Sequence, residues 1–242
     1  MNPVGLITCV LGFLLCACSV DAHEEFVFDS RRATAGPRLE LIALPSAAKQ
    51  QEPKYRLLVQ PGLPRNTLFR VLTKDFSHGF HTITSGFQLD DSGKLVSDEA
   101  GKAVHLDEMT FAPGPYPRGA AWEAALVSAD RTIRLFAKTV PYPIVASDGA
   151  CAVSLELVSQ RGDRFLASGS GFVLGDEVIT ESRYSGRVLQ KHKEVLSTEQ
   201  LTLDVIGHGS RGAGGSARYI VMGRACTVVV DYDWGEAALI RR

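Results

Sequence analysis

The chain has 242 residues, of which 45% are hydrophobic, and its 26 Lys and Arg nearly balance its 27 Asp and Glu for a formal net charge of −1. This balance argues against a nucleic-acid partner, which usually requires a basic face, and the hydrophobic content argues against a disordered chain. The length suits one large domain or two of ordinary size, while 23 Gly and 11 Pro favour many turns between short strands.

The first residues have the pattern of an export signal. Residues 1–20 carry no charged side chain, and residues 4–17 are almost wholly apolar. That stretch matches the apolar core of a signal peptide and is shorter than the roughly 20 residues that cross a bilayer. A retained membrane anchor is the alternative, and we interpret residues 1–22 as a signal peptide.

Two cleavage sites compete in this segment. Leu15-Cys16-Ala17-Cys18 resembles the bacterial lipoprotein box, in which a small residue precedes a cysteine that becomes diacylated and N-terminal. The resemblance implies a lipid anchor on Cys18, and Ser19 would permit sorting to the outer membrane. Cleavage after Ala22 would instead leave His23 as a free N-terminus. We favour the lipoprotein site. Because both sites imply export, we expect an extracytoplasmic protein, at the bacterial outer membrane or in the periplasm, that contacts the membrane through its lipid.

Residues 23–139 are predicted to form an N-terminal β-sandwich domain. Within it, Asp91-Ser92-Gly93 indicates a hairpin turn, and residues 112–117 cannot be regular because proline lacks a ladder donor. Residues 120–127 are compatible with either a helix or a strand. The other apolar-rich stretches predict strands at 38–44, 54–60, 67–73, 86–90, 94–97 and 131–137.

Residues 140–145 are predicted to be a linker, because Pro141 and Pro143 hold the chain extended. Short strands separated by turn signals follow in residues 146–236, a pattern typical of an immunoglobulin-like sandwich. The predicted strands are 151–158, 164–168, 177–183, 187–191, 201–206, 217–222 and 226–233. The sequence therefore predicts an all-β protein of two consecutive β-sandwich domains, the second immunoglobulin-like.

Two cysteines remain outside the signal region. Cys9, Cys16 and Cys18 belong to that region, which leaves Cys151 and Cys226. Each shares the inward face of a strand with period-two apolar residues, and an exported protein meets an oxidising compartment. We therefore predict a disulfide between them, with two buried free thiols as the alternative.

A short motif carries a family resemblance. Residues 169–178 read Gly-Ser-Gly-Phe-Val-Leu-Gly-Asp-Glu-Val. They resemble the Gly-x-Gly-Phe-x-Pro-Gly-Glu-x-Val segment of bacterial immunoglobulin-like repeats in surface proteins, with Leu174 in place of the usual Pro and Asp176 in place of the usual Glu. The resemblance spans about ten residues. It implies an immunoglobulin-like fold and a surface location, and it assigns no binding residue.

Histidines offer a candidate metal site. His78 and His81, three residues apart, could bind copper or zinc together with His105. Asp107 or Glu108 could complete the site. Against this, the spacing of the histidines is not that of a structural metal site.

Two further loops carry short motifs. Residues 207–212, Gly-His-Gly-Ser-Arg-Gly, match the dinucleotide fingerprint by letters, but a strand follows instead of a helix, so we predict a loop. Arg211 and Arg218 could still contact an anionic surface. Arg161-Gly162-Asp163 spells the integrin tripeptide, and we interpret it as a polar turn.

The sequence shows no catalytic constellation. Ser210 lies beside His208, but the Gly-x-Ser-x-Gly elbow is absent and no third group is placed to orient a base. No pattern calls for a cofactor. The leading hypothesis is a non-enzymatic cell-envelope lipoprotein that acts as a binding or assembly module for a protein or polysaccharide partner. The alternative is an extracytoplasmic metal-dependent or hydrolytic enzyme that uses the region of His78, His81 and His105.

Overall fold

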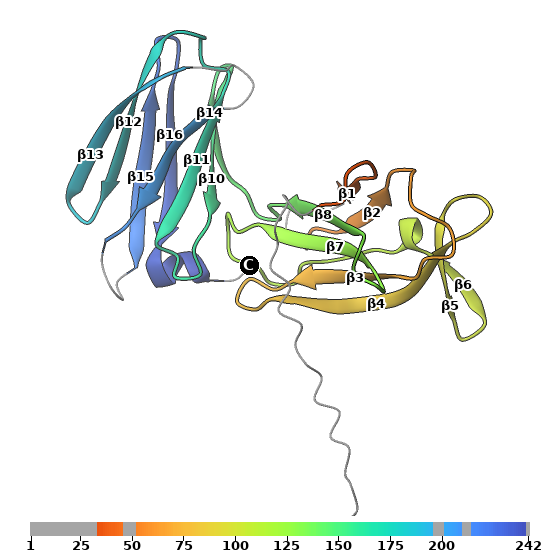
Figure 1. The fold of residues 1–242 in the computed structure, drawn as a ribbon. Helices are drawn as coiled ribbons and strands as arrows, with labels where there is room; N and C mark the ends of the chain where they lie inside the picture. Colours follow the sequence, from red (N-terminus) through yellow and green to blue (C-terminus); the bar gives the residue numbers. More distant parts are fainter. Residues whose placement is uncertain (1–32, 46–51, 196–200, 210–213, 241–242) are drawn as a thin grey trace, which may run out of the picture.

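The computed structural model describes residues 33–45, 52–195, 201–209 and 214–240, and these residues form antiparallel strands with two short 3₁₀ turns and no α-helix. The predicted all-β class is confirmed. Figure 1 shows two β units, an N-terminal unit built from strands up to residue 139 and a C-terminal unit built from strands after residue 143. The predicted signal peptide, with Cys18, lies outside the described residues.

The N-terminal unit is a six-stranded sheet covered on one face by a two-stranded hairpin. The order in the large sheet is β6-β5-β4-β3-β7-β8, and β1 pairs with β2. Its core joins side chains of the hairpin, such as Leu57, to side chains of the sheet, such as Phe69 and Phe87. The elements are β1 (Leu39–Ala43), β2 (Tyr55–Val59), β3 (Phe69–Lys74), β4 (Phe80–Leu89), β5 (Leu95–Glu99), β6 (Lys102–His105), η2 (Leu106–Glu108), β7 (Trp122–Ser128) and β8 (Arg134–Thr139).

Residues 120–127, which the sequence left open between helix and strand, contribute most of strand β7. It lies between β3 and β8, and all its residues except Glu123 are buried. Alternate residues face two separate clusters: Leu126 belongs to the main core, whereas Ala125 and Val127 pack with Leu72 on the opposite face of the sheet. A strand that is apolar on both faces loses the alternation by which strands are recognised, which explains the ambiguity.

The C-terminal unit is a sandwich of two four-stranded sheets. Their orders are β14-β11-β10-β9 and β13-β12-β15-β16. All seven predicted strands are present, and β9 is an eighth. The elements are β9 (Ile144–Asp148), β10 (Cys151–Leu157), β11 (Arg164–Ser170), β12 (Glu177–Tyr184), β13 (Arg187–Glu194), β14 (Leu201–Gly207), β15 (Gly215–Met222), β16 (Thr227–Trp234) and η3 (Gly235–Leu239).

The connections within this sandwich interlock. Strand β14 pairs with β11 although β12 and β13 separate them in the chain, and β15 returns across the sandwich to pair with β12. The chain thus changes sheets three times, between β11 and β12, between β13 and β14, and between β14 and β15, in the Greek-key manner of immunoglobulin-like sandwiches. The predicted immunoglobulin-like architecture is the one observed, with β9 added beside β10.

The predicted disulfide is also present. Cys151 begins β10 and Cys226 precedes β16, with their Cα atoms 6.4 Å apart, so the bond joins the two sheets. In β10 and β16 alternate residues are buried, as the period-two pattern predicted. The bond lies near the end of β9, where the backbone N–H of Thr227 donates to Asp148 at 2.8 Å.

The Gly-x-Gly-Phe motif has a clear packing role. Gly171 has a φ of +76°, and a Cβ there would overlap the carbonyl oxygen of Ala150. A Cβ at Gly169 would lie 2.8 Å from the ring of Phe172, which is buried in the core. Gly171 therefore lets the end of β11 approach the start of β10 closely, and Gly169 leaves room for Phe172 in the interior.

The two units touch directly. Gly119 donates to the carbonyl of Tyr142 at 2.7 Å and accepts from the N–H of Leu157 at 2.9 Å. Lys138 of β8 also pairs with Glu156 of β10 at 2.8 Å. Strand β9 begins at Ile144, so the last two residues of the predicted 140–145 linker are strand. The prolines therefore join two units that pack against each other, and their division into separate domains stays a prediction.

Candidate binding sites

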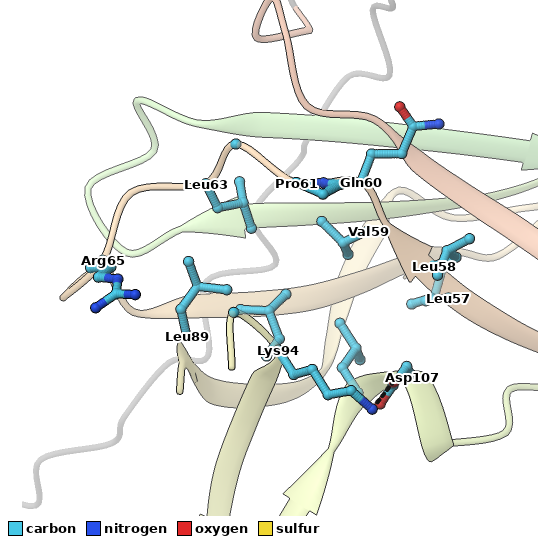
Figure 2. A pocket seen from close by; sticks show the side chains of 14 residues that line it. Leu57, Leu58, Val59, Gln60, Pro61, Leu63, Arg65, Leu89, Lys94 and Asp107 are labelled. Carbon is cyan, nitrogen blue, oxygen red and sulfur yellow. Dashed lines mark ion pairs between the residues drawn. The ribbon is translucent and has the colours of Figure 1, made fainter. Parts of the chain in front are cut away.

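An apolar pocket opens in the N-terminal unit between the end of β2, the β4–β5 hairpin and η2 (Figure 2). Its volume is about 400 Å³, which lies within the range of small-molecule sites. Seven aliphatic side chains from these segments form most of the wall: Leu57, Leu58, Val59, Leu63, Leu89, Leu95 and Leu106.

Charged groups stand at the rim of this pocket. The Nζ atom of Lys94 lies 2.9 Å from one carboxylate oxygen of Asp107, and this contact raises the pKa of Lys94 above its ordinary value. The other oxygen of Asp107 is buried without a hydrogen-bond partner. Arg65 is exposed and has no ion-pair partner within the described ranges. Figure 2 shows Arg65 and the Lys94–Asp107 pair at different ends of the lining.

Local turns fix these rim residues. The predicted hairpin at residues 91–93 is observed: Asp90 accepts from the hydroxyl of Ser92 at 2.7 Å and from the backbone N–H of Lys94 at 2.9 Å. These bonds lower the pKa of Asp90, and Gly93 takes a φ of +81° to complete the turn. The Asp-x-Ser-Gly turn therefore holds Lys94 at the mouth of the pocket.

A second, open hollow is rich in arginine and is lined mainly by the C-terminal unit, with Arg118 contributed by the N-terminal unit. Its lining includes Arg118, Arg183, Arg187 and Arg218, and its volume is about 740 Å³. Arg218, predicted as an anion contact, forms a bidentate pair with Asp231 at 2.6 and 3.2 Å. That pairing lowers the pKa of Asp231 and raises that of Arg218.

Two arginines of this hollow keep their charge uncompensated. Arg183 pairs with Glu181, which lies in the same strand, β12. Arg118 and Arg187, in contrast, have no carboxylate partner in the part of the chain that the structure describes. The uncompensated charges of Arg118 and Arg187 suit an anion, and the contact of Arg218 with an anionic surface stays a prediction. Arg211, the other predicted contact, lies outside the described residues.

Strand β13 is an unpaired edge. Among the described residues it closes the sheet at one side and pairs only with β12. Seven of its eight residues are exposed, including Val188 at 57% and Leu189 at 50%. Natural proteins usually cover or shorten such edges, because the free backbone groups can pair with another chain. The sequence predicted this strand but not its exposure. The signal that could have indicated the exposure was a pair of adjacent aliphatic residues in an otherwise polar strand.

The predicted metal ligands are not assembled. His78 contacts the hydroxyl of Ser77 at 3.0 Å, and His81 lies 3.8 Å from Asp75. His105 is in β6, opposite Val96 of β5, which itself pairs with the far end of β4. Val96 pairs with Gln88 of β4, and Gln88 lies about 20 Å along the strand from His81, because each residue of a strand adds about 3.3 Å. No group of three or more His, Cys, Asp or Glu able to hold a metal occurs among the residues described.

His208 lies in the core. Its Nε2 is 3.0 Å from the hydroxyl of Tyr232, and its ring stacks on Trp234 at 4.8 Å between centroids and meets Tyr184 at 4.4 Å. Burial lowers its pKa to about 4, against a smaller opposing effect from the charge of Asp163. The lowered pKa keeps His208 neutral near pH 7, and aromatic side chains pack around its ring.

The Arg-Gly-Asp turn is folded onto the protein. Asp163 accepts from the hydroxyl of Ser159 at 2.6 Å, which lowers the pKa of the carboxyl. The carbonyl of Gly162 accepts from the N–H of Gly235 at 2.7 Å. The turn thus uses its aspartate and its glycine internally, as the interpretation of a structural turn requires.

Comparison with known proteins gives no assignment. No protein-family model matches the chain, and no curated protein matches it. Among the residues described, no helix has the length and apolar character to cross a membrane. A function for the chain must therefore be inferred from the apolar pocket, the arginine-rich hollow and the exposed edge strand β13.

Proposed function

We propose that the chain is a non-enzymatic cell-envelope lipoprotein whose C-terminal unit binds an extended acidic segment of a partner protein along β13. The observation that carries the proposal is the exposure of β13 over almost its whole length at the edge of a sheet. Adding a strand to a free edge gives affinity through main-chain hydrogen bonds and specificity through alternate side chains.

The hairpin geometry indicates which backbone groups are free. Ser185 and Gly186 have φ values of 47° and 74°, which fit a two-residue type I′ turn. In such a hairpin the closing pair, Tyr184 and Arg187, is hydrogen-bonded, and every second pair along the ladder repeats this. The N–H and C=O groups of Val188, Gln190 and His192 therefore point away from β12, toward an incoming strand.

The charges beside this edge favour an acidic partner. Strand β13 carries Arg187, Lys191 and Lys193 against a single acidic residue, Glu194. Lys191 pairs with Asp204 of β14 at 2.6 Å, whereas Arg187 and Lys193 have no carboxylate partner in the described segments. Because Arg187 also lines the arginine hollow, a partner that continues past the hairpin would meet further positive charge.

The edge can be tested with a designed strand. A fluorescein-labelled peptide of alternating Val and Glu should bind, weaken with rising salt, and protect the amides of Val188, Gln190 and His192 from hydrogen exchange. The matched control peptide alternates Pro and Glu and cannot extend the ladder. Val188→Pro should abolish binding by removing an outward donor. Equal binding of both peptides, or unchanged exchange at these amides, would refute strand addition.

A second variant separates the edge from general charge. Val205 of β14 is exposed to 59%, similar to Val188, and lies in the other sheet. Val188→Glu should weaken binding of the acidic peptide, while Val205→Glu, with the same change in net charge, should leave it unaltered. Equal loss in both variants would indicate nonspecific attraction.

The proposed envelope address has its own test. Cells that express the full chain with labelled palmitate should incorporate the label, and Cys18→Ser should prevent it. Labelling of both proteins, or of neither, would contradict the lipid anchor without bearing on β13.

A further inference from the structure

We propose that the apolar pocket of the N-terminal unit binds a single aliphatic chain that ends in an anionic group. The pocket lies in a different unit from β13, so this inference does not depend on the function proposed above. It concerns a small amphiphilic ligand, not a protein partner.

The pocket has the size and chemistry for an alkyl chain. Its volume of about 400 Å³ is well above the roughly 150 Å³ of an apolar cavity that accepts benzene in another protein. The described residues that line it are mostly aliphatic and include no aromatic ring, so they offer dispersion contacts but no stacking platform for a sugar or a base. A flexible hydrocarbon chain suits such a wall.

The wall also holds apolar side chains that the fold leaves uncovered. Leu58 is exposed to 45%, although its neighbour Leu57 is buried, and both line the pocket. Leu63 and Leu89 are only half-buried. A ligand in the pocket would remove these surfaces from water, which is the general source of affinity for an apolar chain.

The rim selects the sign of the head group. Lys94 is already neutralised by Asp107, whereas Arg65, which lines the pocket elsewhere, has no carboxylate partner among the residues described. An anionic head group at Arg65 would form a charge-assisted hydrogen bond that no protein group provides. Among the described residues that line the pocket, the acidic one is Asp107, which lies beside Lys94 at the other end of the lining. The geometry therefore favours a fatty carboxylate or an anionic lipid with one free chain.

Fluorescence displacement tests the proposal on the full mature chain. The dansyl derivative of undecanoic acid should bind with a blue-shifted emission, and decanoate should displace it at least about tenfold better than decyltrimethylammonium. Decanoate and lysophosphatidylglycerol share the required chemistry, and the stronger competitor identifies the source of the ligand. Absence of a blue shift, or equal displacement by the anionic and cationic amphiphiles, would overturn the proposal.

Variants assign the site. Leu89→Trp and Leu63→Trp should each block the probe by filling the pocket, and two positions are used so that poor folding of one does not decide the result. Arg65→Gln should weaken decanoate binding by about tenfold and leave decanol unaffected. The matched control is Arg164→Gln, which changes an exposed arginine of β11 in the other unit. Equal decanoate affinity in the Arg65→Gln and Arg164→Gln proteins would refute the role of Arg65.

Discussion

His208 should make the C-terminal unit sensitive to mild acid. The side chain is 4% exposed, stacked on Trp234 and bonded through Nε2 to the Tyr232 hydroxyl. Burial lowers its pKa to about 4, from about 6.5 in an unfolded chain. Because the folded-state pKa is depressed, its contribution to stability is fully present above about pH 6.5. It is lost as pH falls through about 4.

The size of this effect follows from the two pKa values. At about 1.36 kcal/mol per pH unit, the interval from about 6.5 to about 4 sets a total loss of about 3 kcal/mol at low pH. At about pH 5 the unfolded histidine is almost fully protonated and the folded one is almost neutral. The free energy of unfolding should therefore be about 2 kcal/mol lower at pH 5 than at about pH 7.5.

Urea unfolding followed by tryptophan fluorescence, to which Trp234 contributes from its position beside His208, measures this difference. The control is His208→Phe, which keeps an aromatic ring in the cluster and removes the titration, with His208→Gln as a second variant. Glu123 of the other unit, whose pKa burial raises, remains in every protein, so its opposite pH effect cancels. If the wild type and the variants lose the same free energy between about pH 7.5 and pH 5, the buried-histidine argument is wrong.

Two stability predictions concern the C-terminal sandwich. Replacing both Cys151 and Cys226 with Ala should lower the free energy of unfolding by about 4 kcal/mol, because the bond closes a loop with a sequence separation of 75. Chemical denaturation of the two proteins measures this, and a loss below about 1 kcal/mol would contradict it. Gly171→Ala should cost at least about 2 kcal/mol, because the new Cβ meets the Ala150 carbonyl at positive φ. Gly207→Ala, with nothing within 4 Å of its Cβ, should change the thermal midpoint little, and similar midpoints for both variants would disprove the packing argument.

Alternation predicted the strands that have one buried face. In β10, β15 and β16, every second residue is buried, and the sequence showed the same period. It missed β6, whose residues are exposed or half-buried, and most of β4, where polar residues face both sides. These strands are held by main-chain pairing with neighbours and not by an apolar face, so their sequences carry no period-two signal.

The candidate sites were harder to foresee, for a different reason. The pocket combines the end of β2 and its following turn with the β4–β5 hairpin and η2, segments that become neighbours only in the folded unit. The predicted histidines illustrate the converse: His78 and His81 are close in sequence, yet the sheet places His105 far from them. Proximity across strands depends on register, which a pattern of single residues does not specify.

The distribution of cross-links within the C-terminal unit gives an independent reason why β13 should be the binding edge. On one side of the sandwich β9 packs against β16, and the Cys151–Cys226 bond and the Thr227–Asp148 hydrogen bond join the sheets there. On the opposite side the ion pair between Lys191 and Asp204 joins β13 to β14, with the Lys191 side chain 52% exposed and the Asp204 side chain 13% exposed. A strand can be added at that side without opening the core, because the covalent bond holds the sheets together elsewhere. Because no disulfide between described residues joins β13 to β14, this side can adjust to a partner while the fold persists.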